Sequence, residues 1–481
     1  MKKSILGSRE CLSHGGSRDL KLLQAEQEEE ILMANLEDKQ PINISEKTTE
    51  NGVTRRQIIK TGAVAAGAVA FAGGFPYISS AQNKTLNIVR GTYFIPGAQE
   101  IAKQQAEEFG KQAGVKVNAD FLNWTDLNTK IGAGIQAGGI DVIELWPVQN
   151  HLYANNLVDM TEEAEEVAAR GGGFEEYVLN SGHVNGRYLG IPHGNNAGTI
   201  AYRISAFEKA GVRHADKGGM DMTWDEYFAV AKECKKMGMP FGQSLGHSLG
   251  DPIGFCYPYM WASGALEVGD DGKTILFNTP TFEYALNKFV QAWKDGYDET
   301  GTSWDDSSNN RAYLSGKISS TFNGASIYYA SKRRDDGGKL MNDTHHMLMP
   351  KGTAGRYHEF GTQTMGILNN SKNIDVAKEY LKWWFKPENF DKWWRVQEGY
   401  QLHHVKNLAN DPMWEDDPKM GIFKEIPKYG RLRGFAGNPN EKASLAASKY
   451  IVVDTFAKAV QSGDAKDALE WGEKQLKRIY R

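Results

Sequence analysis

Cysteine is scarce in this chain, which has three Cys among its 481 residues. Secreted proteins built on disulfide frameworks carry several cysteines at short spacings, so that class is excluded. Cys11 lies in a polar N-terminal segment. Cys234 and Cys256 remain for the main body of the chain, where one disulfide and two buried free thiols fit the sequence equally well.

Long hydrophobic runs are also missing. A membrane-spanning helix needs about 20 predominantly apolar residues. The best candidate, residues 61–75, is shorter than that and consists mostly of Ala and Gly. The sequence therefore excludes a membrane-spanning protein, and the short apolar run needs another explanation.

The chain has no excess of positive charge. It contains 56 Lys and Arg against 60 Asp and Glu, which gives a formal net charge of −4 at pH 7. A nucleic-acid-binding protein needs a basic face to neutralise phosphates. We therefore expect no nucleic-acid partner.

The short apolar run has the flanks of an export signal. Arg55 and Arg56 precede it, and the small residues 79–81 follow it as a cleavage site. A charged region, an apolar region and a small-residue exit are typical of secretory signals. The alternative interpretation is a buried Ala-rich helix. Residues 54–60 (TRRQIIK) resemble the twin-arginine signal, which implies the twin-arginine translocase as a partner during export.

We interpret residues 54–81 as a twin-arginine signal peptide. Residues 1–53 ahead of it are polar and have no obvious packed core, so we expect a disordered leader. Met33 is an alternative start. No Cys follows the apolar run directly, so we expect no lipid anchor. The exported protein is expected to be periplasmic, soluble and monomeric.

Beyond residue 84 the chain begins with alternating strands and helices. The spacing of apolar residues predicts strands at 85–90, 115–121 and 140–146 and helices at 97–113 and 127–135. The third strand is continuously apolar, which is typical of the inside of a parallel sheet. This βαβαβ order predicts an α/β fold with helices on both faces of a parallel sheet.

Aromatic and polar residues follow each of these strands. Tyr93 comes after the first, Trp124 after the second, and Glu144 and Trp146 stand at the end of the third. Ligands of such sheets bind outside the carboxyl ends of the strands. Aromatic rings pack on the C–H faces of a sugar while polar groups bind its hydroxyls. The pattern predicts a site for a small polar molecule such as a sugar; ordinary packing is the alternative for each ring.

Several sequence blocks then occur in the order found in one family. The chain resembles the sugar-binding extracellular solute-binding proteins (family 1) of ABC importers, a group related to maltose-binding protein. The resemblance covers nearly all of residues 84–481. The blocks are 124–131, 139–143 with 153–161, 185–192 with 202–203, 313–318 with 323–324, and 454–480.

The resemblance implies a two-lobed periplasmic-binding-protein fold of type II. Its parallel-rich sheets would be flanked by helices, and crossover hinge strands would join the lobes. Lobe one would comprise about 84–196 and 360–425, and lobe two about 197–358 and 426–481. A sugar or sugar derivative would bind in the cleft, and the lobes would close over it. An ABC permease at the inner membrane would receive it. No catalysis, cofactor or metal is implied.

The candidate ligand contacts combine the strand-end residues with further positions along the chain. Two departures from the family concern this set. Tyr328 and Tyr329 are offset from the family's aromatic position, and Arg203 follows Tyr202 where the family has Asn. The candidates are Tyr93, Trp124, Glu144, Trp146, Asn195, Trp261, Asn323, Gln363, Arg433 and Asn438.

Two adjacent tryptophan pairs mark the helices predicted between 374 and 399. The second helix begins at Pro387, which suits a first helical position. Adjacent residues cannot share one helix face. We therefore expect at least two of these rings to pack between the lobes or reach solvent, with packing in the core or at an interface as the default for all four. The rings are those of Trp383, Trp384, Trp393 and Trp394.

Two other functions match parts of the sequence. Residues 246–250 (GHSLG) match the G-x-S-x-G elbow of serine hydrolases, but that motif needs a strand directly before Ser248 and a helix directly after it. The second is a binding protein for a polyamine or another non-sugar solute; a polyamine site would need carboxylates among aromatic rings, and Asp141, Glu144 and Asp251 could supply some of them. Both remain alternatives to the sugar-binding interpretation.

Two histidine pairs raise the question of a metal site. They are residues 345–346 and 403–404. Metal sites need ligands spaced so that they converge, and adjacent histidines diverge. We therefore expect no metal site.

Overall fold

The fold is built on two main β-sheets, which the computed structural model describes within residues 84–436 and 439–481. The predicted leader at 1–53, the predicted signal peptide at 54–81 and the candidate contact Asn438 lie outside these ranges.

The larger sheet has five strands in the order β2-β1-β3-β11-β6. β1 pairs in parallel with β2 and β3, as the βαβαβ pattern predicts, whereas β11 runs antiparallel to β3 and β6. A strand from far along the chain thus completes the sheet that the N-terminal residues begin. The strands are β1 (Thr85–Gly91), β2 (Lys116–Leu122), β3 (Val142–Leu145), β6 (Ile191–Gly194) and β11 (Gln363–Ile367).

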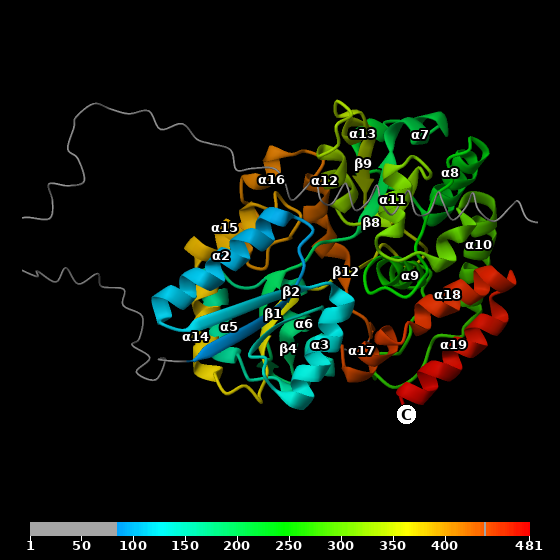
Figure 1. Ribbon diagram of the computed structural model, residues 1–481. Coiled ribbons are helices and arrows are strands. Elements are labelled where there is room, and N and C mark those ends of the chain that lie inside the picture. Colours follow the sequence, from blue (N-terminus) through cyan, green and yellow to red (C-terminus); the bar gives the residue numbers. More distant parts are fainter. Residues whose placement is uncertain (1–83, 437–438) are drawn as a thin grey trace, which may run out of the picture. The chain divides into compact units, whose positions relative to one another are not determined.

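Helices cover both faces of this sheet, and together they form what we call the five-stranded lobe (Figure 1). Leu86 and Ile88 of β1 pack on one face, and Val89 packs on the other, because side chains alternate along a strand. The first face is covered by α2 (Pro96–Ala113), α5 (Thr161–Arg170), α14 (Ile374–Trp384) and α15 (Pro387–Arg395), and the second by α3 (Trp124–Ala137), α4 (Gln149–Leu152) and α6 (Glu176–Gly182).

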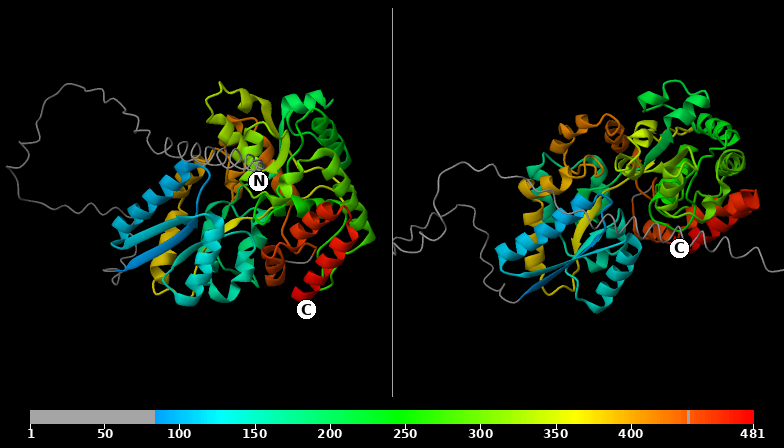
Figure 2. Two further views of the ribbon diagram at one scale, coloured as in Figure 1. Left: turned by 45° about the vertical axis from the view of Figure 1, so that its right-hand side comes forward. Right: turned by 45° about the horizontal axis from the view of Figure 1, so that its top comes forward.

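A smaller antiparallel sheet forms the centre of a second group of elements, the three-stranded lobe. β7 lies between β8 and β9. In both views of Figure 2 the C-terminal helices α18 and α19 lie against this lobe. Its elements include β7 (Thr199–Arg203), β8 (Ser320–Asn323), β9 (Thr344–Met347), α7 (Ile204–Lys209), α8 (Trp224–Lys236), α9 (Asp251–Ala262), α10 (Pro280–Gly296), α11 (Ser308–Leu314), α12 (Ser326–Lys332), α13 (Lys339–Asp343), α18 (Ile451–Ser462) and α19 (Lys466–Ile479).

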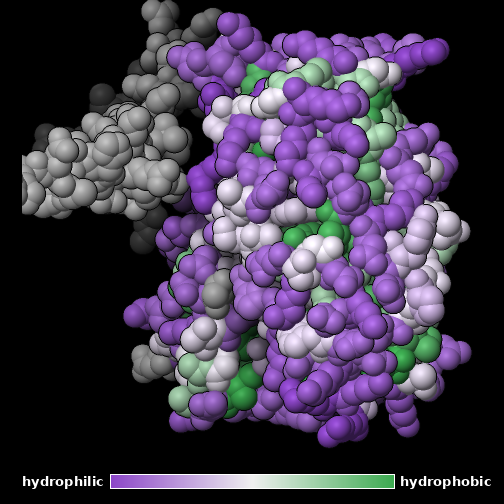
Figure 3. Space-filling view, turned by 90° about the vertical axis from the view of Figure 1, so that its right-hand side faces the viewer, coloured by the Kyte–Doolittle hydropathy of each residue, from purple (hydrophilic) through white to green (hydrophobic). Residues whose placement is uncertain are grey.

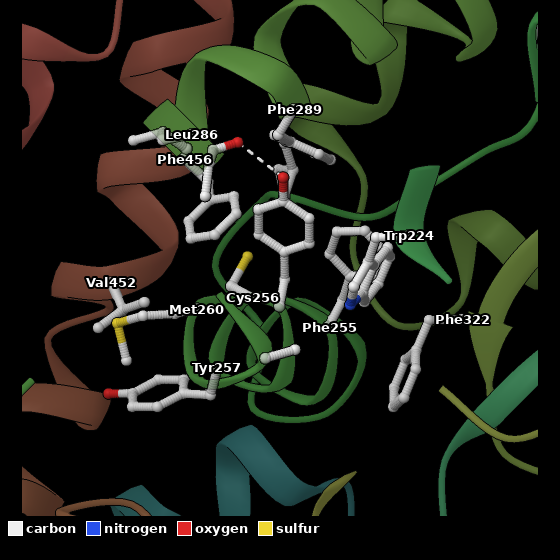
Figure 4. Close-up of a cluster of buried hydrophobic side chains, with 14 of the residues drawn as sticks. Trp224, Phe255, Cys256, Tyr257, Met260, Leu286, Phe289, Phe322, Val452 and Phe456 are labelled. Carbon is white, nitrogen blue, oxygen red and sulfur yellow. Dashed lines mark hydrogen bonds between the residues drawn. The ribbon is translucent and has the colours of Figure 1, made fainter. Parts of the chain in front are cut away.

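Helix α9 is the centre of the core of the three-stranded lobe. Every one of its residues is buried, which fits a sequence (DPIGFCYPYMWA) that is apolar nearly all round. Figure 4 shows side chains of α9 surrounded by those of α8, α10 and α18, including Trp224, Phe289 and Phe456. The packing on all sides fixes the direction of α9, and therefore the position of its first residue, Asp251.

The chain passes between the two lobes at more than one place. Residues 195–198 join β6 to β7, and residues 348–362 lead from β9 back to β11. Within the second connection β10 (His358–Glu359) pairs in parallel with β12 (Gly430–Arg431). The remaining short elements are β4 (His183–Val184), β5 (Arg187–Tyr188), α16 (Met413–Asp416) and α17 (Glu441–Ser448).

None of the four rings of the tryptophan pairs on α14 and α15 reaches solvent. Trp384, Trp393 and Trp394 are fully buried and Trp383 is 4% exposed. Trp393 packs toward the sheet side beside Trp384, while Trp394 lies against Trp414. Both sides of α15 are therefore covered, one by the sheet and the other by residues after the helix, which sequence spacing does not reveal.

The two cysteines of the described body are free. Cys234 and Cys256 are both buried as thiols, and burial raises the pKa of each. This resolves the alternative that the sequence left open.

The outer face of the three-stranded lobe is mainly hydrophilic. Figure 3 shows this face, and its apolar side chains form small separate patches. Within residues 84–436 and 439–481, no helix has both the length and the apolar character that crossing a membrane requires.

A buried carboxyl group holds the C-terminal helix to the three-stranded lobe. Glu267 is fully buried, and the Tyr480 hydroxyl donates a hydrogen bond of 2.8 Å to its Oε1. Burial raises the pKa of Glu267 to about 7, although Tyr480, Tyr257 and the charge of Arg433 oppose the shift. The ionised form is therefore less favourable in the folded chain than in the unfolded one.

This raised pKa predicts a pH-dependent gain in stability for Glu267→Gln. With the folded pKa above the unfolded one, the stability that Glu267 contributes is fully present below the unfolded pKa and is lost as pH rises through about 7. From pH 5 to pH 8 the variant should gain about 2 kcal/mol relative to the wild type. Urea unfolding at both pH values measures this.

The exposed Glu470 of α19 supplies the matched control. Glu470→Gln should show the same pH dependence as the wild type. If Glu267→Gln also follows the wild type, the buried carboxyl does not titrate in this range.

Candidate functional site

A buried group of charged and polar side chains joins three strands of the five-stranded sheet. Glu144 of β3 is fully buried, its Oε2 lies 3.5 Å from Arg90 Nε, and its Oε1 lies 3.0 Å from His193 Nε2. The Gly91 N–H donates to Glu144 Oε2 (3.0 Å), and the Tyr93 hydroxyl donates to both carboxylate oxygens (3.2 and 3.3 Å). The structure thus brings together two of the predicted contacts, Tyr93 and Glu144.

Aromatic rings enclose the cation of this group. Arg90 is 1% exposed, and its guanidinium lies 4.6 Å from the ring centroid of Trp384 and 5.6 Å from that of Trp393. Burial opposes ionisation of Glu144, but the charge of Arg90 and the hydrogen bonds from His193 and Gly91 outweigh it and lower its pKa to about 2. Glu144 is therefore an ionised partner of Arg90 with both oxygens already engaged.

Trp124 and Trp146 lie together at the neighbouring strand ends. Their ring centroids are 4.7 Å apart at an interplanar angle of 70°. Trp124 packs directly on Gly91, because a Cβ at that position would come within 2.3 Å of the indole. Both tryptophans are partly exposed. The two predicted aromatic contacts thus form one partly exposed aromatic corner.

Asn195 and Gln363 stand where the sheet leads into the connections. Asn195 Nδ2 donates to the Gly361 carbonyl (3.0 Å), and Gln401 Nε2 donates to Gln363 Oε1 (3.3 Å). Gly194, directly before Asn195, has a φ of 104°, and a Cβ there would meet the Leu402 carbonyl at 2.0 Å. The Oδ1 of Asn195 is buried and accepts no hydrogen bond within the described part of the chain.

Asn323 belongs to a polar group on the three-stranded lobe. Its Nδ2 donates to Asn310 Oδ1 (2.5 Å) and to Asp251 Oδ2 (3.3 Å), and its Oδ1 accepts from Ser326. Asn309 Nδ2 also donates to Asp251 Oδ2 (2.5 Å). The group therefore presents amides, a hydroxyl and a carboxylate from the N-terminal end of α9 and the end of β8.

Residues of the five-stranded lobe face this polar group across what we call the inter-lobe seam. Asn196 Nδ2 lies 3.5 Å from the Tyr400 hydroxyl and 3.2 Å from where a Cβ of Gly324 would stand. Tyr400 packs edge-on against Tyr329 (5.9 Å) and stacks on Phe94 (5.5 Å, 18°). Phe94 is 36% exposed. The seam therefore combines aromatic rings and hydrogen-bonding groups from both lobes.

Trp261 and Arg433 occupy a separate position. Trp261 is 1% exposed and packs against Tyr357 and Phe435 in the core of the three-stranded lobe. Arg433 is 3% exposed, pairs with Glu359 at 2.8 Å, and donates to the Pro147 carbonyl of the five-stranded lobe at 3.4 Å. Arg433 thus links the two lobes near the connection that contains β10.

The GHSLG segment lacks the arrangement of a hydrolase. Ser248 lies in a loop, and its hydroxyl donates to Asp306 Oδ1 at 2.7 Å. His247 points elsewhere, with Nε2 at 2.7 Å from Asp454 and its ring stacked on Tyr450. The serine and the histidine therefore do not form a nucleophile and base pair.

The adjacent histidines are packed in the interior. Burial lowers the pKa of His346 to about 3 and that of His403 to about 4, and it lowers the pKa of His404 well below its usual value. Among the residues that the structure describes, no three His, Cys, Asp or Glu side chains converge as metal ligands.

Sequence reasoning did not select three residues that the seam contains. Phe94 directly follows the predicted contact Tyr93, so strand-end position could have indicated it. Asp306 and Tyr400 lie in loops without a sequence signal of their own, and only the packing of α9 and α15 brings them to the seam.

The sequence matches a known family model over most of its length. The model is described as "Bacterial extracellular solute-binding protein", and it matches residues 104–422. The chain belongs to this family. It is therefore a solute-binding protein and not an enzyme, as the sequence predicted.

Related proteins of known sequence agree with this assignment. A binding protein of Brucella abortus (strain 2308) is 23% identical over 346 residues, which cover 69% of this chain and 75% of that protein. A binding protein of Brucella suis biovar 1 (strain 1330) is similar to the same extent.

Solved structures of solute-binding proteins share the fold. T. maritima MalE3 with bound maltose superimposes with a TM-score of 0.66 at 20% identity, over 82% of this chain and 99% of that one. A sugar transporter protein of Arthrobacter chlorophenolicus A6 with laminaribiose gives 0.70 at 18% identity (82% and 99%). An Agrobacterium radiobacter K84 protein with ribitol gives 0.68 at 17% (83% and 99%). The predicted periplasmic-binding-protein fold is confirmed.

The buried charge group predicts a strong non-additive effect on the stability of this solute-binding protein. Arg90→Met would leave the Glu144 carboxylate buried without its cation, which costs about 3 to 5 kcal/mol. Arg90→Met combined with Glu144→Gln should recover at least half of that loss, because no charge remains unpaired. Denaturant unfolding of the single and double variants measures both values. Additive losses would show that the two side chains act independently.

Proposed function

We propose that this protein binds a neutral sugar or sugar derivative at the inter-lobe seam and delivers it to an ABC importer. The observation that carries the proposal is the arrangement of the seam. Phe94 and Tyr400 offer apolar ring surface, while Asp251, Asn310 and Asn323 offer hydrogen-bonding groups on the opposite lobe. A sugar needs both, because its ring has C–H faces and its rim has hydroxyls.

Proteins of the same fold support this ligand class. The three solved structures above were obtained with maltose, laminaribiose and ribitol. These ligands are neutral and rich in hydroxyl groups. Each of the three proteins is 20% identical to this chain or less, and the experiment below identifies the particular sugar.

The sequence candidates enter the proposal in two ways. Five of them lie at strand ends or connections and are proposed to contact ligand: Trp124, Trp146, Asn195, Asn323 and Gln363. Tyr93 and Glu144 are proposed to hold these positions in place from the interior of the five-stranded lobe. Trp261 and Arg433 are proposed to hold the connection between the lobes in place.

Transport follows from closure of the two lobes. We propose that the lobe boundaries lie near those predicted from the sequence, and that ligand contacts made from both sides stabilise a closed form. An ABC permease at the inner membrane would bind that form. Export by the twin-arginine translocase, as residues 54–81 predict, would deliver the folded monomer to the periplasm.

A polyamine is the second candidate ligand. One observation favours it: the structure shows no ion pair for Asp251 or Asp306 within the described ranges, so an ammonium group could supply the missing cation. Polyamine sites combine carboxylates with aromatic walls, and the seam has both.

A thermal-shift panel with maltose, laminaribiose, ribitol, D-glucitol and spermidine tests the proposal. A ligand at 100 times its dissociation constant adds about 2.7 kcal/mol of stability, which raises the melting temperature by several degrees. A shift with hydroxyl-rich compounds supports sugar binding. A shift with spermidine alone replaces it with the polyamine alternative.

The aromatic wall predicts a loss of affinity for Phe94→Ala. Removing the ring should weaken binding of the shifting sugar by about tenfold, because an aromatic contact contributes about 0.5 to 1.5 kcal/mol beyond its buried area. Isothermal titration calorimetry measures the change. Tyr284→Ala removes an exposed ring (68%) from the outer face of α10 and should leave affinity unchanged. Equal effects of the two substitutions would place the ligand elsewhere.

A further inference from the structure

Asp306 caps the first turn of α9 from a different part of the chain. Its Oδ1 accepts hydrogen bonds from the Asp251 N–H and the Ser248 hydroxyl, both 2.7 Å long, and its Oδ2 accepts from the Gly250 N–H (3.1 Å). The residue before the helix, Gly250, has no side chain to cap it. Asp306 thus satisfies N–H groups that the helix leaves open, and the helix dipole favours its negative charge there.

Asp251, the first residue of α9, is fixed on one side only. Two amides, those of Asn309 and Asn323, donate to its Oδ2. Asp251 is 9% exposed, and none of the described residues donates a hydrogen bond to its other oxygen, Oδ1. Each oxygen of a carboxylate can accept hydrogen bonds, and donors at both oxygens favour the ionised form. The side chain therefore holds one unused acceptor in a nearly buried position.

The polar group that contains Asp251 borders the seam, because Asn323 donates to Asp251 Oδ2 and the Cβ position of the next residue, Gly324, lies 3.2 Å from Asn196 Nδ2. Burial raises the pKa of the Tyr400 phenol, and the charges of Asp251 and Asp306 raise it further. Tyr400 also carries the stacked ring of Phe94. The open acceptor of Asp251 thus lies on the same seam as the aromatic surface proposed to hold a sugar ring.

Among the described residues, no positive side chain forms an ion pair with either carboxylate. The ion pairs of the described residues include neither Asp251 nor Asp306. Burial raises the pKa of Asp251, and the negative charge of Asp306 raises it further. The raised pKa means that negative charge is already unfavourable at this place, so the charge of an anionic ligand would be unfavourable there as well.

We propose that Asp251 Oδ1 accepts a hydrogen bond from a donor group of the ligand, and that Asp251 and Asp306 exclude anionic solutes from the seam. Asp251 is the contact residue, and Asp306 is a positioning residue that also contributes charge. The inference rests on the proposed function and narrows it, because sugar acids and sugar phosphates become poor ligands. Repulsion of a wrong ligand is a recognised route to specificity.

Matched pairs of compounds test this exclusion. D-glucitol and D-gluconate differ by a hydroxymethyl group in place of a carboxylate, as do maltitol and maltobionate. Calorimetric titration at pH 7.5 should show the neutral member binding at least about tenfold more tightly than its acid. An acid that binds as tightly as its neutral partner, or more tightly, overturns the inference.

Asp251→Asn is the main variant, because an amide oxygen can still accept from Asn309 and Asn323. The substitution should weaken binding of the neutral ligand by about tenfold and reduce the ratio of neutral-ligand affinity to acid affinity several-fold. Asp295→Asn removes a charge from an exposed pair with Lys232 and should change neither value. Asp306→Asn, checked for folding by circular dichroism, should also reduce the ratio. An unchanged ratio in both seam variants overturns the inference.

Spermidine distinguishes this inference from the proposed function. If spermidine binds and no sugar does, sugar binding is wrong, but exclusion of anions stands provided that Asp251→Asn weakens spermidine. If D-gluconate or maltobionate is the best ligand, sugar-class binding stands and the exclusion is wrong.

Discussion

The buried ion pair of Arg90 and Glu144, with His193 beside it, determines the geometry of the sheet edge on which the seam is built. These three residues belong to β1, β3 and β6, and they meet at the ends of those strands. Phe94 follows Arg90, Trp146 follows Glu144 and Asn195 follows His193, each within a few residues along the chain. Burying charges is costly unless they are paired, so the pair fixes the strand ends, and the strand ends position the residues proposed to meet ligand.

The same group explains why so many aromatic residues gather on one face of the sheet. An arginine removed from water needs compensation beyond a single carboxylate, and the rings of Trp384 and Trp393 provide it through their negative faces. Helices α14 and α15 supply these rings, which are buried. On the three-stranded lobe the described residues offer the acidic pair Asp251 and Asp306 only hydrogen-bond donors, among them helix N–H groups and amides. One lobe therefore neutralises its buried charge internally, and the other leaves it open toward the seam.

Local patterns were sufficient for the N-terminal half of the five-stranded lobe. The strands and helices from 85 to 146 and the start of α15 at Pro387 match the predicted elements closely, because apolar spacing, glycine stops and proline at the first helical turn act over short range. The insertion of β11 into the same sheet, and the burial of all four tryptophans, could not be read from the sequence. The first depends on segments more than 200 residues apart coming together, and the second also depends on the residues that follow α15.

The sequence by itself determined the α/β class, the alternation of elements and the type of side chain at each strand end, since these follow from periodicity and composition. It could not decide whether a strand-end residue would face ligand or support its neighbours. The sequence pattern predicted Glu144 as a ligand contact, whereas in the structure Glu144 is fully paired in the interior. Asp306 and Tyr400 carried no signal in the sequence. That distinction depends on distances across the fold, because a carboxylate is available to a ligand only where the tertiary structure leaves one of its oxygens without a partner.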